Sequence, residues 1–372
     1  MDKPLKIIIS GGGTGGHIFP AVSIANAIMA KHPDAQILFV GAKGRMEMQR
    51  VPQAGYRIEG LPVRGLVRPL YSPKNIGVAV DYLHSMLLAR KIVRTFKPQV
   101  AVGVGGYASA AALRAAESLG VPCLIQEQNS YAGKTNKMLG AKASKICVAY
   151  DGMERFFPAD KIVKTGNPVR QNVVNASITK EDARRQFGLD PDKKTILLVG
   201  GSLGARTINE SMRQHLDMVR DADVQFIWQT GKYYNAEMTA AVSKFGELPN
   251  LKVLDFISDM GAAYKAADLV ISRAGASSIS EFCLIGKAVI LVPSPNVAED
   301  HQTKNAMALV NKDAAIYVKD AEAPGTLLKR ALQTVADDAL LARLSENIKK
   351  LGFKNSADII ADEVVKLAAT RA

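Results

Sequence analysis

The chain has 372 residues, of which 48% are hydrophobic and 22% charged, as expected for a soluble globular protein of about two domains. Its three cysteines are widely spaced and form no CxxC pair, so the sequence indicates neither a disulfide framework nor a zinc site, and a reducing compartment fits. The formal net charge of +13 favours an anionic partner, whereas no signal peptide and no apolar run of membrane-spanning length is visible.

Predicted strands alternate with helical patterns along the chain, which predicts an α/β fold of two Rossmann-like, doubly wound domains. In the first half, strands are predicted at 6–10, 36–40, 100–104, 122–126 and 145–149. In the second half, they are predicted at 195–199, 224–228, 252–255, 269–272 and 288–292. We expect the ligand to bind in a cleft between the two halves, at the carboxyl ends of the strands.

The domain boundaries follow from the restart of this pattern after a loop near residues 161–170. The first domain is expected at 1–165 and the second at 166–352. The last stretch, 337–372, has apolar residues at helical spacing, and its end at about 353–372 is expected to pack back on the first domain.

A glycine-rich turn follows the first predicted strand, with Gly-Gly-Gly-Thr-Gly-Gly-His at 11–17. Glycines let a ligand approach main-chain N–H groups, and the helix that begins there offers unpaired N–H groups to an anion. The turn is therefore interpreted as a phosphate-binding loop. His17 is its only side chain that can exchange a proton near neutral pH.

A nicotinamide or flavin oxidoreductase is an alternative, because Gly11, Gly13 and Gly16 fit the pattern G-x-G-x-x-G. That fingerprint requires an acidic residue at the end of the second strand, to hold a ribose hydroxyl. The chain instead continues as Gly41-Ala-Lys43 at that point. The dinucleotide interpretation is weakened accordingly.

Further glycine-rich or small-residue turns follow other predicted strands, at 102–109, 200–207 and 272–281. Several such turns in one cleft favour more than one phosphate group. Glu281, about two turns into its helix, can accept both hydroxyls of a ribose, although a solvated glutamate is the alternative. Arg170 can bind a phosphate through two hydrogen bonds, although an ion pair is equally typical of an arginine at a domain junction.

Several segments together resemble the MurG family, the bacterial N-acetylglucosaminyltransferases that convert lipid I to lipid II in peptidoglycan synthesis. The resemblance extends in order from the first strand to about residue 310 and rests on the segments 12–17, 126–129, 132–136, 166–170, 200–205, 273–281 and 300–302. It implies the GT-B fold and transfer of GlcNAc from UDP-GlcNAc to undecaprenyl-pyrophosphoryl-MurNAc-pentapeptide (lipid I). It implies no cofactor and no metal.

The same resemblance implies roles for individual residues, all of them in the glycine-rich turns or in the loops that follow strands. In the first half these are Thr14, Gly15 and Gly16 for donor or acceptor, Gly105, Gly106 and Tyr107 for the acceptor, and Asn129 for the donor sugar. In the second half they are Arg170 and Ser202 for the diphosphate, Ile257 for uracil, Ala276 and Ser277 at a helix start, Glu281 for the ribose and Gln302 for GlcNAc. Two positions depart from the family pattern: Thr303 stands where a second glutamine is common, and Gly275-Ala-Ser-Ser278 replaces a small-Leu-Thr form.

The implied reaction is a single displacement that inverts the anomeric carbon. The C4 hydroxyl of MurNAc attacks C1 of GlcNAc as UDP leaves, so one general base is needed and no protein nucleophile. His17 is the candidate base, with an electrostatic or structural role as the alternative. Arg170, Ser202 and helix N-termini would stabilise the charge that develops on UDP.

A helix predicted at 76–94 carries an apolar stripe of Ile76, Val80, Leu83 and Leu87, followed by Arg90, Lys91, Arg94 and Lys97. Between residues 43 and 97 there are eleven Lys or Arg and only three acids. An apolar face beside cations suits an anionic lipid surface, so we expect a peripheral protein at the cytoplasmic face of the bacterial inner membrane. An ordinary core helix is the alternative.

Two other classes of function are less well supported. The basic isoelectric point of about 9.5 suggests nucleic-acid binding, but the sequence lacks an RNP, KH or zinc-finger signature and has only 6% aromatic residues. No nucleic-acid partner is therefore expected. A related GT-B transferase that uses another UDP-sugar is the nearer alternative.

Overall fold

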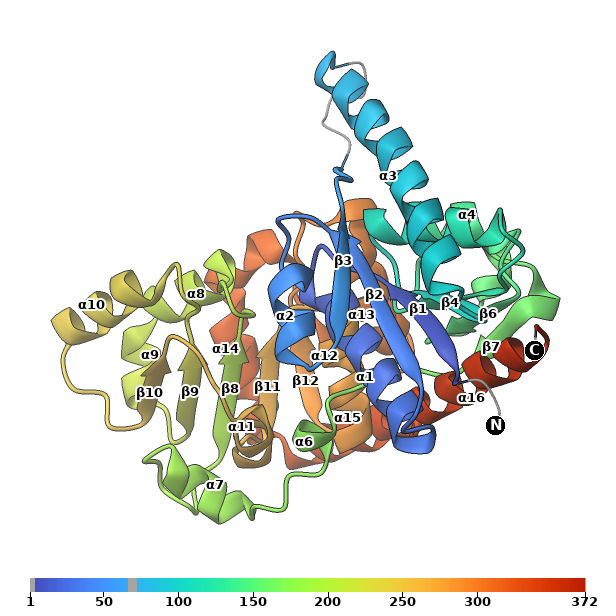
Figure 1. Cartoon of the computed structure of the whole chain (residues 1–372). Coiled ribbons are helices and arrows are strands. Elements are labelled where there is room, and N and C mark those ends of the chain that lie inside the picture. Colours follow the sequence, from blue (N-terminus) through green and yellow to red (C-terminus); the bar gives the residue numbers. More distant parts are fainter. Residues whose placement is uncertain (1–3, 66–71, 372) are drawn as a thin grey trace. The chain divides into compact units, whose positions relative to one another are not determined.

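The computed structural model describes residues 4–65 and 72–371, which form two compact units (Figure 1). Unit 1 comprises Met1–Val169 and Phe353–Ala372, and unit 2 comprises Arg170–Gly352. The chain therefore enters unit 2 after Val169 and returns to unit 1 for its last helix. Arg68, one of the basic residues counted in the 43–97 segment, lies outside the described residues.

The strands of unit 1 are β1 (Lys6–Ser10), β2 (Gln36–Ala42), β3 (Arg57–Leu61), β4 (Val100–Gly103), β5 (Cys123–Glu127), β6 (Lys145–Val148) and β7 (Ile162–Lys164). Those of unit 2 are β8 (Thr195–Val199), β9 (Gln225–Gln229), β10 (Leu251–Leu254), β11 (Leu269–Ser272), β12 (Ala288–Leu291) and β13 (Ile316–Tyr317).

The helices of unit 1 are α1 (Gly15–Lys31), α2 (Glu47–Gln53), α3 (Lys74–Phe96), α4 (Tyr107–Glu117), α5 (Lys134–Gly140) and α16 (Ser356–Ala369). Those of unit 2 are α6 (Gln171–Val174), α7 (Lys180–Gln186), α8 (Arg206–Arg213), α9 (Leu216–Asp221), α10 (Asn235–Phe245), α11 (Met260–Ala266), α12 (Ala276–Ile285), α13 (His301–Val310), α14 (Ala323–Ala336) and α15 (Asp338–Lys350). None of the helices in the described ranges combines the length and the apolar character needed to cross a membrane.

Each unit is built on one parallel sheet. The strand order is β3-β2-β1-β4-β5-β6-β7 in unit 1 and β10-β9-β8-β11-β12-β13 in unit 2. In both sheets the order reverses beside the first strand, β1 or β8, which is where doubly wound sheets bind their ligands. The predicted α/β class is confirmed.

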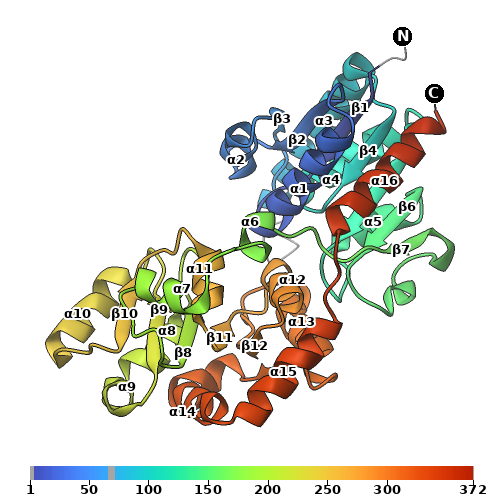
Figure 2. The ribbon, with the colours of Figure 1, turned by 90° about the horizontal axis from the view of Figure 1, so that it is seen from below.

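Helices cover both faces of the unit 1 sheet because its central strand is apolar on both sides. Ile7 and Ile9 of β1 face a core shared with α1 and α16, whereas Ile8 faces the core shared with α3 and α4. The two views show α16 beside α1, and the residues of these two helices are in contact (Figure 2). A helix from the end of the chain therefore completes one face of the first sheet.

Unit 2 has the same layered construction. Ile196 and Leu198 of β8 share a core with α8 and with the late helices α14 and α15. Trp228 of β9 is fully buried in that core, and its indole N–H donates to Asn209 Oδ1 at 2.9 Å. The shared core fixes the direction in which β8 and β9 deliver their following loops.

The structure differs from the sequence-based expectation at the sheet edges and near the C-terminus. Strands β3, β7 and β13 were not predicted; all three lie at sheet edges, where strands are short and their hydrophobic pattern is weak. The helical stretch predicted at 337–372 is two helices, α15 and α16. The chain turns between them at Asn355, whose φ of 60° is left-handed.

Candidate active site

Three loops at the carboxyl edge of the unit 1 sheet carry the predicted first-half residues. The loops follow β1, β4 and β5, which are neighbours in the sheet, so they gather at one place. They hold Thr14, Gly15, Gly16 and His17 after β1, Gly105, Gly106 and Tyr107 after β4, and Asn129 after β5. The structure thus brings the three first-half loops together, whereas the expected cleft between the two halves stays a prediction.

The first loop presents the start of α1. Thr14 is the N-cap residue, and its carbonyl accepts hydrogen bonds from the N–H groups of His17 and Ile18. Gly15 and Gly16 form the first turn, where N–H groups have no acceptor within the helix. These two amides are suited to an anionic group.

His17 links the first loop to the loop after β4. Its Nδ1 lies 2.9 Å from the carbonyl oxygen of Gly12, and a Cβ placed on Gly105 would lie 2.9 Å from its Nε2. A Cβ on Gly106 would lie 2.6 Å from the same Gly12 oxygen, and both glycines have positive φ. Only glycine fits this contact between the two loops.

One amide of the first turn is bound by the protein itself, so phosphate binding stays a prediction for the other amides of this turn. The N–H of Gly13 donates to Glu47 Oε2 at 2.9 Å, so this amide is engaged by a protein carboxylate. Glu47, in α2, is 1% exposed. Sequence reasoning missed it because nothing in the local pattern around a first helical residue distinguishes a buried glutamate from a solvated one.

A second buried carboxylate, Glu127, orders the loop that contains Asn129. Its Oε1 accepts from the backbone N–H and the Nδ2 of Asn129, and its Oε2 accepts from Gly133 N and Asn136 Nδ2. Asn129 is therefore held by two hydrogen bonds of 3.0 and 3.2 Å to one oxygen. In the sequence, Glu127 can be recognised as an acidic residue at a strand end, followed by a helix start that supplies hydrogen-bond donors.

The segment Gly166-Asn-Pro is tied to the same edge of unit 1. Asn167 accepts from Gln126 Nε2 at 2.9 Å, and its own Nδ2 donates to the carbonyl of Gln128. Gln128 in turn donates to the carbonyl of Val104, just before the loop that holds Gly105. These amides fix the spacing between the loops that follow β4 and β5.

Most of the predicted second-half residues lie in loops or first helical turns at the carboxyl edge of the unit 2 sheet. They are Ser202 after β8, Ile257 after β10, Ala276 and Ser277 after β11, and Gln302 after β12. Ser202 is exposed, Ile257 is buried, and Ala276 and Ser277 form the first turn of α12. The Gln302 Oε1 atom accepts from the N–H of Ser294 at 2.9 Å, which orients its amide.

Two glycines allow the loops after β8 and β9 to touch. A Cβ on Gly204 would lie 2.2 Å from the Thr230 carbonyl, and one on Gly231 would lie 2.0 Å from Gly204 N. The N–H of Lys232 then donates to the carbonyl of Ser202 at 3.2 Å. The β8 loop is thereby held against its neighbour.

Glu281 is a buried member of an ion pair. Its side chain is 2% exposed, so the alternative of a solvated glutamate is wrong. Arg170 Nε and Nη2 donate to its two oxygens at 2.8 and 3.0 Å, and the Tyr264 hydroxyl donates at 3.2 Å. The ion-pair alternative for Arg170 is therefore the arrangement observed.

The charge states of this cluster follow from its surroundings. Burial, the largest single influence, lowers the pKa of the Arg170 guanidinium, but the hydrogen bonds to Glu281 and the negative charge of Glu281 together raise that pKa by more, so the net shift is upward. Burial and then the Glu281 carboxylate raise the pKa of the Tyr264 hydroxyl well above its usual value. Arg170 remains a cation and Tyr264 remains a hydrogen-bond donor at neutral pH.

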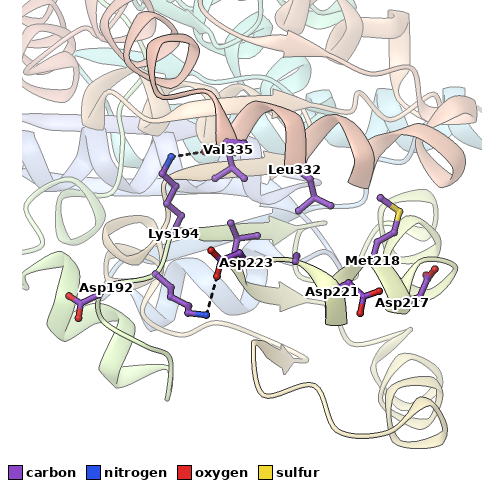
Figure 3. Close-up of a pocket in the computed structure, with 12 residues that line it drawn as sticks. Asp192, Lys194, Asp217, Met218, Asp221, Asp223, Leu332 and Val335 are labelled. Atoms are coloured by element: carbon purple, nitrogen blue, oxygen red, sulfur yellow. Dashed lines mark hydrogen bonds and ion pairs between the residues drawn. The ribbon is translucent and has the colours of Figure 1, made fainter.

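A pocket at the amino ends of the unit 2 strands contains none of the predicted residues. It has a volume of about 780 Å³ and is lined by residues around the amino ends of β8 and β9, including Lys194, Asp221 and Asp223 (Figure 3). Lys193 pairs with Asp223, and Lys194 pairs with Asp338. The loops with functional residues are at the opposite, carboxyl edge.

The three cysteines are buried. Burial raises the pKa of the Cys147 and Cys283 thiols to about 12, so both are protonated at neutral pH and are poor nucleophiles. Within residues 4–65 and 72–371, no group of three or more His, Cys, Asp or Glu residues gathers as a metal site.

Comparison with known proteins assigns both units to one family. Residues 7–148 match the glycosyltransferase family 28 N-terminal domain, and residues 195–361 match the family 28 C-terminal domain. The two matches cover the unit 1 sheet except for β7 and the first residue of β1, and the whole sheet of unit 2.

Relatives match the chain over nearly its whole length. The UDP-N-acetylglucosamine–N-acetylmuramyl-(pentapeptide) pyrophosphoryl-undecaprenol N-acetylglucosamine transferase of Phocaeicola vulgatus is 66% identical over 99% of this chain and 98% of its own. The protein of the same name from Bacteroides thetaiotaomicron is also 66% identical, over 99% of both chains. The crystal structure of MurG from Acinetobacter baumannii superposes with a TM-score of 0.79 at 29% identity, covering 98% of this chain and 100% of that one. The chain therefore belongs to glycosyltransferase family 28 and, within it, to the MurG family of N-acetylglucosamine transferases.

Proposed function

We propose that this protein transfers GlcNAc from UDP-GlcNAc to the C4 hydroxyl of MurNAc in lipid I, which yields lipid II for peptidoglycan synthesis. The observation that carries the proposal is 66% identity over 99% of the chain to a transferase named for this donor and acceptor. The positions of the predicted site residues at the carboxyl edges of two parallel sheets support it.

We assign the two substrates to different units. Unit 2 binds UDP-GlcNAc: Ile257 holds uracil through its main chain, Glu281 the ribose, Arg170, Ser202 and the start of α12 the diphosphate, and Gln302 the sugar. The loops after β1 and β4 in unit 1 bind the acceptor. Each anionic group then meets a helix N-terminus, where N–H groups are free of intrahelical partners.

The chemistry is one displacement with inversion. His17 Nε2 takes the proton of the C4 hydroxyl as that oxygen attacks C1 of GlcNAc, and the bond from C1 to the UDP oxygen breaks with its electron pair. Negative charge then grows on UDP, where the N-terminal amides of α12 and the Ser202 hydroxyl stabilise it. No protein nucleophile takes part in a reaction with a single inversion.

The direct test is release of UDP from UDP-GlcNAc. We expect release to depend on a lipid I analogue and to exceed the analogue-free hydrolysis by at least about 100-fold, because attack by a positioned hydroxyl replaces attack by water. A coupled UDP assay measures it. An equal rate of UDP release with and without the lipid I analogue would contradict the proposal. A larger thermal shift with UDP-glucose than with UDP-GlcNAc would favour a transferase that uses another UDP-sugar.

We also propose that α3 binds an anionic lipid surface and so attaches unit 1 to the cytoplasmic face of the inner membrane. Four large apolar side chains of α3 are mostly exposed: Ile76 at 71%, Val80 at 60%, Leu83 at 65% and Leu87 at 69%. Successive members are one helical turn apart, so they form one stripe. The ordinary core helix considered as the alternative would bury such a stripe.

Cations continue the apolar stripe toward the C-terminus of α3. Lys91, Arg94 and Lys97 are exposed, and Arg94 lies two turns beyond Leu87 on the same face. Figure 1 shows the N-terminal turns of α3 extending beyond the other elements of unit 1, which leaves this face accessible. Apolar residues at one end and cations at the other match the acyl region and the anionic headgroups of a leaflet.

Replacing both Leu83 and Leu87 with glutamate should reduce binding to anionic vesicles about 100-fold or more. Each leucine contributes roughly 1.5–3 kcal/mol when it leaves water, and each glutamate adds repulsion from the headgroups. Sedimentation with phosphatidylglycerol vesicles, at low and high salt, measures the change. Phe245→Glu, on exposed α10 of unit 2, is the matched control. Equal sedimentation of the α3 variant and the wild type would refute the lipid contact.

A further inference from the structure

Glu47 is a buried carboxylate whose partners in the described structure are two backbone amides. It is 1% exposed, its Oε1 accepts from Ala42 N at 3.0 Å, and its Oε2 accepts from Gly13 N at 2.9 Å. A buried charge is costly unless hydrogen bonds replace its hydration. The end of β2 and the first glycine loop are thus joined through one side chain.

The glycines around Glu47 make room for its carboxylate. A Cβ on Gly12 would lie 2.1 Å from Oε1, and a Cβ on Gly41 would lie 2.6 Å from the Glu47 Cγ. Real Cβ atoms do not approach so closely. Gly12 of the first glycine loop and Gly41 near the end of β2 are therefore required by the carboxylate, independently of any ligand.

The peptide group that Glu47 binds is also the one that His17 binds. The N–H of Gly13 and the carbonyl of Gly12 belong to the same peptide group, and that carbonyl lies 2.9 Å from His17 Nδ1. A carbonyl oxygen only accepts, so Nδ1 carries the proton and a neutral ring has its lone pair on Nε2. A carboxylate, a peptide and an imidazole form one hydrogen-bonded chain.

The hydrogen bonds from Glu47 through the Gly12–Gly13 peptide to His17 have an electrostatic consequence. A carboxylate bonded to the N–H of a peptide polarises it and increases the negative charge on its carbonyl oxygen. The Gly12 carbonyl then holds the Nδ1 proton more strongly, which favours the tautomer with a free Nε2. It also stabilises the positive ring that forms when Nε2 takes up a proton.

Other titratable groups lie on the surrounding elements. Arg50 is on α2, Tyr107 is on α4, and Glu127 is at the end of β5, where Asn129, Gly133 and Asn136 bind it. On α1 itself, Lys31 lies at the far end and pairs with Asp362. Among these groups, Glu47 is the one joined to His17 through a shared peptide.

We propose that Glu47 is a positioning residue that sets the tautomer of His17 through the Gly12–Gly13 peptide. The inference deepens the proposed function and rests on His17 as the base. Proton transfer to Nε2 leaves the Nδ1 proton in place, and the charge of Glu47 offsets the new positive charge through the polarised peptide. The role is that of the carboxylate in a Ser-His-Asp triad, with a peptide group interposed.

The first test is the tautomer of His17 in the folded wild-type protein. The chain has five histidines, so ¹⁵N spectra of histidine-labelled protein, assigned with His17→Ala, resolve its ring nitrogens at alkaline pH. We expect the proton on Nδ1. A wild-type ring with its proton on Nε2 would overturn the proposal, and this measurement needs no activity.

The second test is Glu47→Gln, which keeps the shape and removes the charge. We expect a mixture of both tautomers and a fall in kcat of about tenfold, with the KM for UDP-GlcNAc nearly unchanged. Circular dichroism and thermal unfolding establish that the variant is folded. An unchanged tautomer and unchanged kcat in folded Glu47→Gln would refute the role.

Glu127→Gln is the matched control for the tautomer. Glu127 is also a buried carboxylate bonded to backbone N–H groups at the same sheet edge, but Asn129, Gly133 and Asn136 are its partners. The Glu127→Gln variant should therefore have the same His17 tautomer as the wild type. Undiminished turnover in His17→Ala would show that His17 is not the general base of the proposed reaction. The tautomer measurement would still show whether Glu47 sets the tautomer of His17.

Discussion

His17→Ala is expected to lower kcat by about 10²- to 10⁴-fold, the usual contribution of a general base. The ring lies at the carboxyl edge of the unit 1 sheet, with Nδ1 bound to the Gly12 carbonyl and Nε2 facing Gly105. Without it, the attacking hydroxyl must lose its proton to water. Because a base acts only in the transition state, kcat and kcat/KM should fall together.

Steady-state release of UDP with a lipid I analogue measures this loss, and isothermal titration with UDP tests whether nucleotide binding persists. His32→Ala is the matched control, since His32 lies at the other end of the same helix, at the C-cap of α1. It should have wild-type kcat. Turnover of His17→Ala at the wild-type rate would mean that another group is the base.

Glu281→Gln is expected to weaken UDP binding by about tenfold or more, because it removes the charge that we propose accepts the ribose hydroxyls. The wild-type carboxylate already accepts three hydrogen bonds, two from Arg170 and one from Tyr264. A carboxylate has about four lone-pair sites, so a ribose that uses both hydroxyls must displace one of these donors. We expect the Arg170 pair to open on one side when the nucleotide binds.

A comparison of UDP with 2′-deoxy-UDP isolates the ribose contact. The wild type should bind the deoxy nucleotide about tenfold more weakly, whereas Glu281→Gln should bind the two nucleotides almost equally. Calorimetric titration of both nucleotides gives the four affinities. Equal discrimination in the variant and the wild type would place the ribose elsewhere.

Tyr264→Phe is the control for indirect effects on the Glu281 carboxylate. It removes the 3.2 Å hydrogen bond to Glu281 but keeps the ring that packs on Phe282. We expect it to retain discrimination between the two nucleotides. A loss as large as that of Glu281→Gln would indicate that the orientation of the carboxylate, rather than its charge, carries the effect.

The sequence determined the strands at the centre of each sheet and the loops that follow them. The strands predicted at 6–10, 195–199 and 269–272 have the bounds found in β1, β8 and β11, because buried parallel strands are short continuous apolar runs. Glycines mark the turns after several of these strands, since close backbone contacts such as Gly106 with Gly12 exclude a side chain. The family resemblance rested in part on these same turns.

The sequence also predicted a helix at 76–94, which the structure extends to Lys74–Phe96, and the spacing of its apolar residues. Whether that stripe is covered or exposed depends on the neighbours of α3, which are distant in sequence. The structure leaves Ile76, Val80, Leu83 and Leu87 exposed. Exposure is a property of packing, and the helical period alone carries no information about it.

The tertiary structure alone decided which polar groups are partners. Arg170 and Glu281 are far apart in sequence and were each expected to bind a nucleotide group, yet they bind each other. Glu47 drew no attention in the sequence, yet it holds the first glycine loop through Gly13. Local patterns predict backbone conformation because they act between near neighbours, whereas the partners of a buried charge are set by whichever segments the fold brings within hydrogen-bonding distance.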